Sequence, residues 1–184
     1  MIYLLRHGQT DWNAIKRLQG ITDIPLNDNG RQMAIDAGEK YKDIDFAACF
    51  CSPLVRAKET AELFLQGKDV PIIEETRFRE MCFGEYEGME FKELGNNPTI
   101  QKLFNEPEQY VAQNGTETFE ELFSRTTSAV ENIKKLYDIK NNNVLIVGHG
   151  AMCSGIICSY EGIQLKDFWT TLLKNCELYE LKND

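Results

Sequence analysis

The sequence predicts an α/β fold, a three-layer α/β/α sandwich in which helices cover both faces of a mostly parallel central sheet. The first observation behind this prediction is that short apolar runs of strand length alternate with longer stretches of helical periodicity. The second is that 184 residues, 42% hydrophobic and 27% charged, suit one globular domain with a buried core. We therefore expect a single domain over residues 1–184, with residues 80–140 partly forming a helical cover over the site.

Each expected element follows from a local pattern. Apolar runs predict strands at residues 2–5, 46–51, 70–74, 144–147 and 177–181. Helical spacing predicts helices at 27–42, 52–66 and 117–138, shorter helices between 90 and 112, and a last helix after Gly150 that ends near 160. Asn27 or Asp28 is the expected cap of the first helix. Ser52 is the expected cap of the second, with Pro53 at its first position.

Charge and composition argue against several classes of function. The chain has 20 basic and 29 acidic residues and a net charge of -9, so we expect neither nucleic acid nor a membrane surface as partner. No apolar run approaches the roughly 20 residues of a membrane span, and the N-terminus lacks the features of a signal peptide. We therefore expect a cytoplasmic protein whose six cysteines remain thiols. Without a CxxC pair, and with two histidines in all, no metal site is expected.

Both histidines of the chain follow a predicted buried strand. The segment Arg6-His7-Gly8 comes directly after strand 2–5, and Gly148-His149-Gly150 comes directly after strand 144–147. In a mostly parallel sheet, the carboxyl ends of the strands form the site. Imidazole acts as a nucleophile or exchanges protons near neutral pH, and neighbouring glycines allow a ligand or backbone to approach closely. A single histidine near a strand is more often structural, but two in equivalent places indicate a functional pair.

Two arginines add the capacity to bind an anion. Arg6 directly precedes the first histidine, and Arg56 lies near the start of the helix expected from Ser52. The side chain of Arg56 leans back toward that helix N-terminus, which itself favours an anion. A guanidinium binds phosphate or carboxylate through two parallel hydrogen bonds. Taken alone, a surface ion pair of Arg56 with Glu59 or Glu62 is the simpler explanation.

A third charged element is Arg79-Glu80, followed by the Gly-rich, aromatic segment 82–88, which we expect to form an ordered loop. A carboxylate near two arginines can serve as a general acid. Taken alone, this segment is also explained as a solvated run of charges, and the residues themselves do not rank Glu80, Glu85 and Glu87. Among the aromatic side chains nearby, either an apolar pocket wall or the core is expected for Phe83, Tyr86 and Phe91.

Together these segments resemble the histidine phosphatase superfamily, the phosphoglycerate mutase-like proteins. The resemblance is carried by Arg6-His7-Gly8-Gln9-Thr10 through Asn13, by Gly20, by residues 25–34, by Ser52-Pro53-Leu54-Val55-Arg56-Ala57, by residues 79–88 and by Val147-Gly148-His149-Gly150. These blocks follow the order of the family and span nearly the whole domain up to residue 150. The resemblance implies a phosphoglycerate mutase-like fold and phosphoryl-transfer chemistry, for which we expect no cofactor.

The resemblance also implies roles for the residues that match. The family histidine at the position of His7 is phosphorylated during turnover. Arg6, Arg56 and His149 match the groups around the transferred phosphoryl group, and Glu80 matches the carboxylate that protonates the leaving group and then activates water. Two arginines and a protonated His149 supply positive charge without a metal. Because His7 must be neutral to attack, we expect its other ring nitrogen to donate to a fixed acceptor such as a backbone carbonyl.

Further contacts to the phosphoryl group or the substrate are expected at Thr10, Asn13, Gln19, Gly20 and Gly150. Gln19 stands where mutases often carry a small hydroxyl residue, and the segment between Glu80 and His149 is shorter than in phosphoglycerate mutases. We therefore expect a metal-independent phosphomonoesterase that acts through phosphohistidine on a small phosphorylated metabolite. The alternatives are cofactor-dependent phosphoglycerate mutase-type phosphoryl transfer and a non-catalytic phosphate-binding module. The sequence gives no indication of the oligomeric state.

Overall fold

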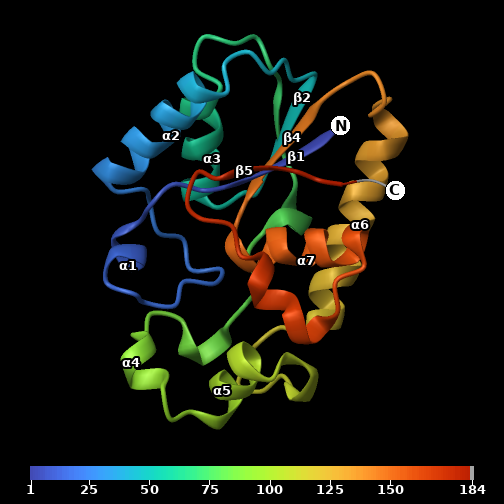
Figure 1. Ribbon diagram of the computed structural model, residues 1–184. Coiled ribbons are helices and arrows are strands. Elements are labelled where there is room, and N and C mark those ends of the chain that lie inside the picture. The colour runs from blue at the N-terminus through green and yellow to red at the C-terminus, as the bar shows by residue number, and fades with distance from the viewer. Residues whose placement is uncertain (183–184) are drawn as a thin grey trace.

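The computed structural model describes residues 1–182, and within them five strands form one sheet with helices on both faces (Figure 1). The strands are β1 (Ile2–Arg6), β2 (Ala48–Cys51), β3 (Ile72–Glu74), β4 (Val144–Gly148) and β5 (Leu178–Glu180). Their order across the sheet is β3-β2-β4-β1-β5. Strand β5 runs antiparallel to β1, whereas the other neighbouring pairs are parallel. The predicted α/β/α architecture is therefore confirmed.

The predicted helices are present with shifted ends. The α-helices are α1 (Asp11–Ala14), α2 (Asp28–Lys40), α3 (Val55–Phe64), α4 (Phe91–Leu94), α5 (Pro98–Asn105), α6 (Phe119–Leu136) and α7 (Gly150–Glu161). Single turns and a longer stretch of 3₁₀ helix cover Thr76–Phe78, Gly84–Tyr86, Pro107–Gln109 and Leu165–Thr171. Asn27 caps α2 as predicted, because its side chain accepts from the Gly30 amide at 2.8 Å. The sequence analysis did not predict α1 or the 3₁₀ helix Leu165–Thr171.

Side chains of the central strands alternate between the two faces of the sheet. Ile2 and Leu4 of β1 lie in the core that the sheet shares with α6 and α7. Tyr3 and Leu5 lie in the core that it shares with α2 and α3. Figure 1 shows α2 and α3 on one side of the strands and α6 on the other. Burying one such large apolar side chain contributes about 1.5–3 kcal/mol, so both faces stabilise the sandwich.

A further apolar cluster lies beyond the carboxyl ends of the strands. It joins residues 81–104 to α6, α7 and Leu165–Thr171, with Phe83, Leu103 and Phe168 among its buried members. Figure 1 shows α4 and α5 together at this end of the molecule. Within the expected cover 80–140, α4 and α5 therefore lie near the strand ends, whereas α6 packs against α7 as part of the sandwich.

The start of α3 differs from the prediction. The helix begins at Val55, and its N-cap is Leu54, which makes no side-chain capping bond. Ser52 is fully buried directly after β2, and its amide donates to the Val147 carbonyl at 3.0 Å. The predicted capping role of Ser52, with Pro53 in the first helical position, is therefore wrong. The physical reason is that pairing with β4 keeps the chain extended for one residue past β2.

Two further expectations concern the chain as a whole. Among residues 1–182, no helix combines the length and the apolar character that a membrane crossing requires. All six cysteines lie in this part of the chain and are free thiols, as predicted. Four of them are buried, so they contribute to the core as small apolar groups.

Candidate active site

The carboxyl ends of three neighbouring strands bring three polar side chains to one edge of the sheet. His7 follows β1, His149 follows β4 and Ser52 follows β2, and these strands pair in parallel register up to their last residues. The ring centroids of His7 and His149 are 5.2 Å apart. The structure thus brings together the two histidines that the sequence placed after different strands.

The imidazole of His7 is buried, oriented and neutral. Its Nδ1 lies 2.6 Å from the Gly8 carbonyl oxygen. A carbonyl can only accept, so Nδ1 carries the ring proton and Nε2 keeps its lone pair. Burial, together with the positive charges of Arg56 and Arg6, lowers the pKa of His7 well below 6.5. The expected backbone acceptor for the second ring nitrogen is therefore present, and it is the carbonyl of Gly8.

His149 is fully buried beside His7. Its Nε2 lies 2.7 Å from the Ser52 hydroxyl oxygen, and its Nδ1 has no hydrogen-bond partner among the described residues. Burial and the nearby charge of Arg56 lower the pKa of His149 well below 6.5. The expectation of a protonated His149 concerns the site with a phosphoryl group bound and stays a prediction; burial and the guanidiniums by themselves favour the neutral ring.

Arg56 is fully buried rather than part of a surface ion pair. Its Nη1 donates to the Thr22 carbonyl at 2.9 Å, and its Nη2 donates to the Gly20 carbonyl at 2.6 Å. Its Nε has no hydrogen-bond partner among residues 1–182. Burial lowers the pKa of Arg56 to about 10, and the charge of Glu80 opposes this shift, so the group stays cationic at neutral pH. The alternative pairing with Glu59 is wrong, because Glu59 pairs instead with a different arginine at 2.5 Å.

Arg6 repeats this arrangement on the other side of His7. Its Nη1 donates to the Leu173 carbonyl at 2.6 Å, while its Nε finds no partner within the described part of the chain. Burial lowers the pKa of Arg6, and Glu80 again opposes the shift. The site therefore holds the buried guanidinium of Arg56 and the partly buried guanidinium of Arg6, each anchored through terminal nitrogens and each with an Nε donor unused. Such donors suit the oxygens of a phosphoryl group.

Glu80 lies at the N-terminus of α7. Its Oε1 accepts from the amides of Met81 at 2.9 Å and Met152 at 3.0 Å, and its Oε2 accepts from the Ala151 amide at 3.2 Å. The first amides of a helix have no partner within the helix, so the carboxylate satisfies two of them and meets the positive end of the helix dipole. The side chain is fixed and only 8% exposed.

The structure also ranks the three candidate carboxylates. Glu87 accepts from the amides of Ile21, Thr22 and Phe83, and thus ties the loop around residue 20 to the segment after Glu80. Glu85 is exposed. Of the three, Glu80 alone lines the cavity between the histidine and the arginines.

That cavity has a volume of about 110 Å³, and eight of the ten predicted site residues line it: Arg6, His7, Asn13, Gln19, Gly20, Arg56, Glu80 and Gly150. The remaining two, His149 and Thr10, are fully buried next to it. The hydroxyl oxygen of Thr10 accepts from the Asn13 amide at 3.1 Å and lies 3.0 Å from the Gln19 Oε1 atom. Thr10 therefore orients two lining residues instead of facing the cavity itself.

Two glycines meet a backbone or space requirement in this cavity. Gly20 has a φ of +60°, a conformation that turns its carbonyl toward Arg56 and that residues with a Cβ rarely adopt. A Cβ on Gly150 would lie 2.7 Å from a methyl carbon of Leu172 and 3.6 Å from the guanidinium carbon of Arg6. Glycine at position 150 therefore lets α7 begin directly against the anion-binding groups.

The sequence analysis missed part of the cavity wall. Phe83 and Phe91 line it, whereas Tyr86 is buried elsewhere and its hydroxyl accepts from Asn114. The missed lining residues are Arg17, Leu18, Phe104, Ala151, Trp169 and Leu172. Trp169 and Leu172 come from a segment without a recognisable motif, and no signal in the sequence connects this segment to the site.

The same C-terminal segment also contacts the backbone of His7 and the side chain of Arg6. The Asn175 side chain donates to the His7 carbonyl at 2.8 Å, and the carbonyl of Leu173 anchors Arg6. Among the described residues, no three His, Cys, Asp or Glu side chains are grouped so that they could hold a metal ion. The arrangement is thus a small cavity with a neutral imidazole, two guanidiniums and one carboxylate, and it is suited to transfer of an anionic group.

Comparisons with known proteins agree with this chemistry. Residues 2–184 match the model of the histidine phosphatase superfamily (branch 1), and the chain belongs to this family. It is 35% identical over 185 residues to the uncharacterized phosphatase PhoE of Bacillus subtilis, with 98% of this chain and 90% of that protein covered. It is 30% identical over 187 residues to the probable phosphoglycerate mutase GpmB of Escherichia coli, with 96% and 82% covered.

The fold agrees equally well with a solved structure. YhfR of Bacillus stearothermophilus superposes with a TM-score of 0.87 and 32% sequence identity, over 95% of this chain and 86% of that one. The expected family is therefore confirmed, and membership together with the phosphatase-named relative supports phosphatase activity.

Proposed function

We propose that this protein is a metal-independent phosphomonoesterase that acts on a small phosphorylated metabolite through a phosphohistidine intermediate at His7. The observation that carries the proposal is the neutral imidazole of His7, fixed through Nδ1 on the Gly8 carbonyl, in one cavity with two guanidiniums that each keep an unused Nε donor. A lone pair on Nε2 and cationic donors around it are what an in-line transfer of a phosphoryl group requires.

In the first step, Nε2 of His7 attacks phosphorus while the bond from phosphorus to the ester oxygen breaks. The electron pair of that bond leaves with the oxygen, which takes a proton from the carboxyl group of Glu80. Arg6 and Arg56 bind the remaining phosphoryl oxygens and stabilise the charge that develops on them. The bound dianion favours the protonated form of His149, which then supplies one more donor.

In the second step, the carboxylate of Glu80 takes a proton from a water molecule, and the water oxygen attacks phosphorus. The phosphorus–nitrogen bond breaks, its electron pair returns to Nε2 of His7, and inorganic phosphate leaves. One carboxylate thus serves as acid and then as base. Its fixed position on the α7 amides keeps it available for both halves of the reaction.

A second candidate function is mutase-type transfer, which the similarity to GpmB favours. In that reaction the same phosphohistidine returns its phosphoryl group to a phosphoglycerate instead of to water. The phosphatase-named relative is the more similar of the two, at 35% against 30% identity, and this favours hydrolysis. Both functions share the first step, so the fate of the phosphoryl group distinguishes them.

The test is phosphate release from a panel of small esters, including p-nitrophenyl phosphate, phosphoserine and 3-phosphoglycerate, in excess EDTA. We expect release that EDTA does not reduce and that His7→Ala lowers by on the order of 10⁶-fold, the scale seen when an enzyme loses its nucleophile. His149→Ala is the matched control, because it removes the neighbouring imidazole and keeps the nucleophile. Glu80→Gln should accumulate acid-labile phosphohistidine with the nitrophenyl ester.

Three outcomes contradict the proposal. Release that EDTA abolishes would show a metal requirement, and equal activity of His7→Ala and wild type would exclude the covalent step. If no ester releases phosphate but labelled phosphoryl groups exchange between phosphoglycerates, the mutase function holds instead.

A further inference from the structure

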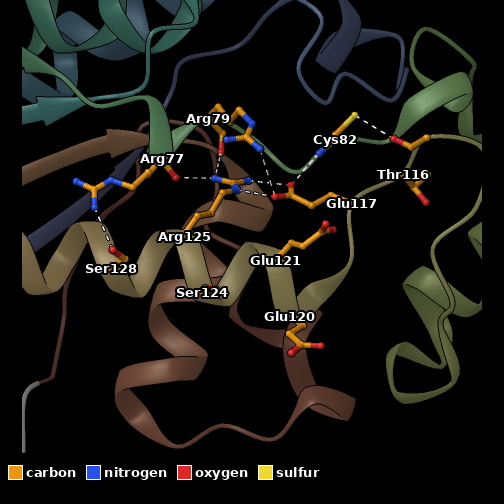
Figure 2. Close-up of a pocket in the computed structure, with 11 residues that line it drawn as sticks. Arg77, Arg79, Cys82, Thr116, Glu117, Glu120, Glu121, Ser124, Arg125 and Ser128 are labelled. Carbon is orange, nitrogen blue, oxygen red and sulfur yellow. Dashed lines mark hydrogen bonds and ion pairs between the residues drawn. The ribbon is translucent and has the colours of Figure 1, made fainter.

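A second group of arginines lies outside the catalytic cavity, on the face of α6 near its start. We name the hollow there the α6 groove; it has a volume of about 760 Å³ and is lined by Arg77, Arg79, Glu117 and Arg125, among others. Figure 2 shows Arg125 reaching from α6 toward Glu117 and toward the backbone around Arg79. The side chains of Arg125 and Glu117 are 10% and 6% exposed.

The guanidinium of Arg125 uses all five of its N–H donors. Two of them form a forked pair with Glu117, from Nε to Oε1 at 2.6 Å and from Nη2 to Oε2 at 2.9 Å. The other three reach backbone carbonyls: Nη1 donates to Arg77 at 2.6 Å and to Arg79 at 2.8 Å, and Nη2 donates to Glu80 at 3.1 Å.

Glu117 adds one further contact to the same backbone segment. Its Oε2 also accepts from the Cys82 amide at 3.2 Å. The pair of Arg125 and Glu117 therefore holds the backbone of residues 77–82 at four points. The next residue of the chain, Thr118, caps α6 with a hydrogen bond to the Glu121 amide at 3.0 Å, so the helix start that carries the pair is itself fixed.

Glu80 lies in the middle of the segment that this pair holds. Its carbonyl accepts from Arg125, while its carboxylate accepts from the amides of Ala151 and Met152 at the start of α7. Residue 80 is thus clamped between two helices, by its backbone on the α6 side and by its side chain on the α7 side. A buried ion pair contributes little net stability after desolvation, so the geometry it imposes is its main consequence.

We infer that Arg125, held by Glu117, is a positioning residue that sets the reach of the Glu80 carboxylate toward the leaving oxygen and the attacking water. This inference rests on the proposed function, in which Glu80 is the acid and then the base. A displacement of about 1 Å in such a group can lower a rate by on the order of 10²-fold. Lysine at position 125 keeps the charge but lacks the fork that binds Glu117 and three carbonyls at once.

The experiment compares Arg125→Lys with wild type on two kinds of ester. A simple alkyl phosphate needs a proton on its leaving oxygen, whereas p-nitrophenolate leaves without one. We expect kcat/KM for the alkyl phosphate to fall about 30- to 100-fold and kcat/KM for p-nitrophenyl phosphate to fall less than about 3-fold, since acid catalysis typically contributes 10²–10⁴-fold. Turnover of the nitrophenyl ester should also show a burst, because hydrolysis of phosphohistidine still needs the base.

The matched control is Arg77→Lys. Arg77 lines the same groove, but its guanidinium donates to Glu75 and Ser128 rather than to the backbone around Glu80. This control should leave the ratio of the two kcat/KM values unchanged. Glu117→Gln provides a second variant, because it keeps the shape of the partner and weakens the fork; a smaller change in the same direction is expected.

The outcomes separate this inference from the proposed function. A role for Arg125 in stability alone would lower both kcat/KM values by the same factor together with Tm, and that result overturns the inference. If the wild type is active and depends on His7, but Arg125→Lys leaves the ratio of the two kcat/KM values unchanged, the inference is overturned. The proposed function then stays intact. Absence of release from every ester by the wild type overturns the proposed function, and the inference falls with it.

Discussion

Two hollows of this molecule, the α6 groove and the catalytic cavity, contain guanidinium groups. The hydrogen-bond donors of these groups are occupied in the first and partly unoccupied in the second. In the α6 groove, every N–H donor of Arg125 is bonded to a carboxylate or to one of three carbonyls. In the catalytic cavity, Arg6 and Arg56 are anchored through their terminal nitrogens, and each keeps an Nε without a partner among the described residues. All donors of Arg125 in the larger hollow are thus bonded, whereas Arg6 and Arg56 in the smaller one each keep a donor without a partner among residues 1–182.

This difference supports the smaller cavity as the proposed anion site. The α6 groove measures about 760 Å³ and the catalytic cavity about 110 Å³, so size alone would select the wrong place. A buried donor without a partner carries a desolvation cost of about 1–3 kcal/mol, which a bound phosphoryl oxygen would remove. A saturated arginine such as Arg125 offers no such gain and instead fixes the backbone that it contacts.

The largest effect expected from this comparison follows from removing a guanidinium of the cavity. Arg56→Ala should lower kcat/KM for the preferred ester by on the order of 10²–10³-fold, because one charged donor to the transferred group is lost. Arg31→Ala is the matched control, since Arg31 also contacts α3, through Glu59 at 2.5 Å, but on the surface. Steady-state phosphate release measures both, with circular dichroism to verify folding. If Arg56→Ala lowers kcat/KM by less than threefold, the proposed difference between the two hollows is wrong.

The two histidines of the proposed active site could be selected from the sequence because each stands in a local pattern. His7 and His149 follow apolar strands, and the parallel register of β1 with β4 brings any residues at these positions together. Glu80 could be selected only through the family resemblance, because its distinguishing feature is contact with the amides of α7, which lie about 70 residues further along the chain.

The parts that sequence reasoning missed depend on long-range packing. Trp169 and Leu172 line the cavity, and Asn175 holds His7, but no periodicity or motif connects residues 165–176 to the strand ends. Ser52 looked like a helix cap because Ser-Pro commonly opens a helix. Its amide instead continues the pairing of β2 with β4, and this brings its hydroxyl to the ring of His149.

A second prediction uses the pH dependence of stability to test the charge of the cavity. His7 and His149 are neutral in the folded protein, because burial and the nearby arginines lower their pKa well below 6.5. Unfolding frees both to bind protons near pH 6.5. The stability is therefore highest well above pH 6.5 and decreases as the pH falls through 6.5, with a limiting slope of about 1.4 kcal/mol per pH unit for each histidine.

Urea unfolding at about pH 7.5, 6.5 and 5.5 measures this effect. The free energy of unfolding should fall about three times more between the last two values than between the first two. His149→Gln should lose about half of that fall, because one of the two titrating groups is gone. An equal slope in His149→Gln and wild type would mean that His149 binds protons in the folded protein as it does in the unfolded chain, and burial and the arginines would then not lower its pKa.

The smallest expected effect concerns the aromatic wall on the apolar side of the cavity. Among the described residues, the α6 groove has no such wall. Trp169 and Phe104 contact each other in a tilted arrangement with ring centroids 4.6 Å apart, and both line the cavity together with Arg17. An aryl leaving group should gain about 0.5–1.5 kcal/mol from such a contact. Trp169→Ala should therefore raise KM for p-nitrophenyl phosphate about twofold to tenfold and change KM for a small alkyl phosphate less.

Trp169→Phe is the control for this prediction. It keeps an aromatic face but removes the indole N–H that donates to the Leu103 carbonyl at 2.6 Å. If the aromatic face matters, the phenylalanine variant retains the wild-type preference for aryl over alkyl esters, and only the alanine variant loses it. If both variants lose the preference equally, the hydrogen bond to Leu103 orders the wall and the ring itself contributes nothing to the leaving group. In that case the cavity recognises its substrate through the phosphoryl group alone, and its two unpaired guanidiniums account for the binding.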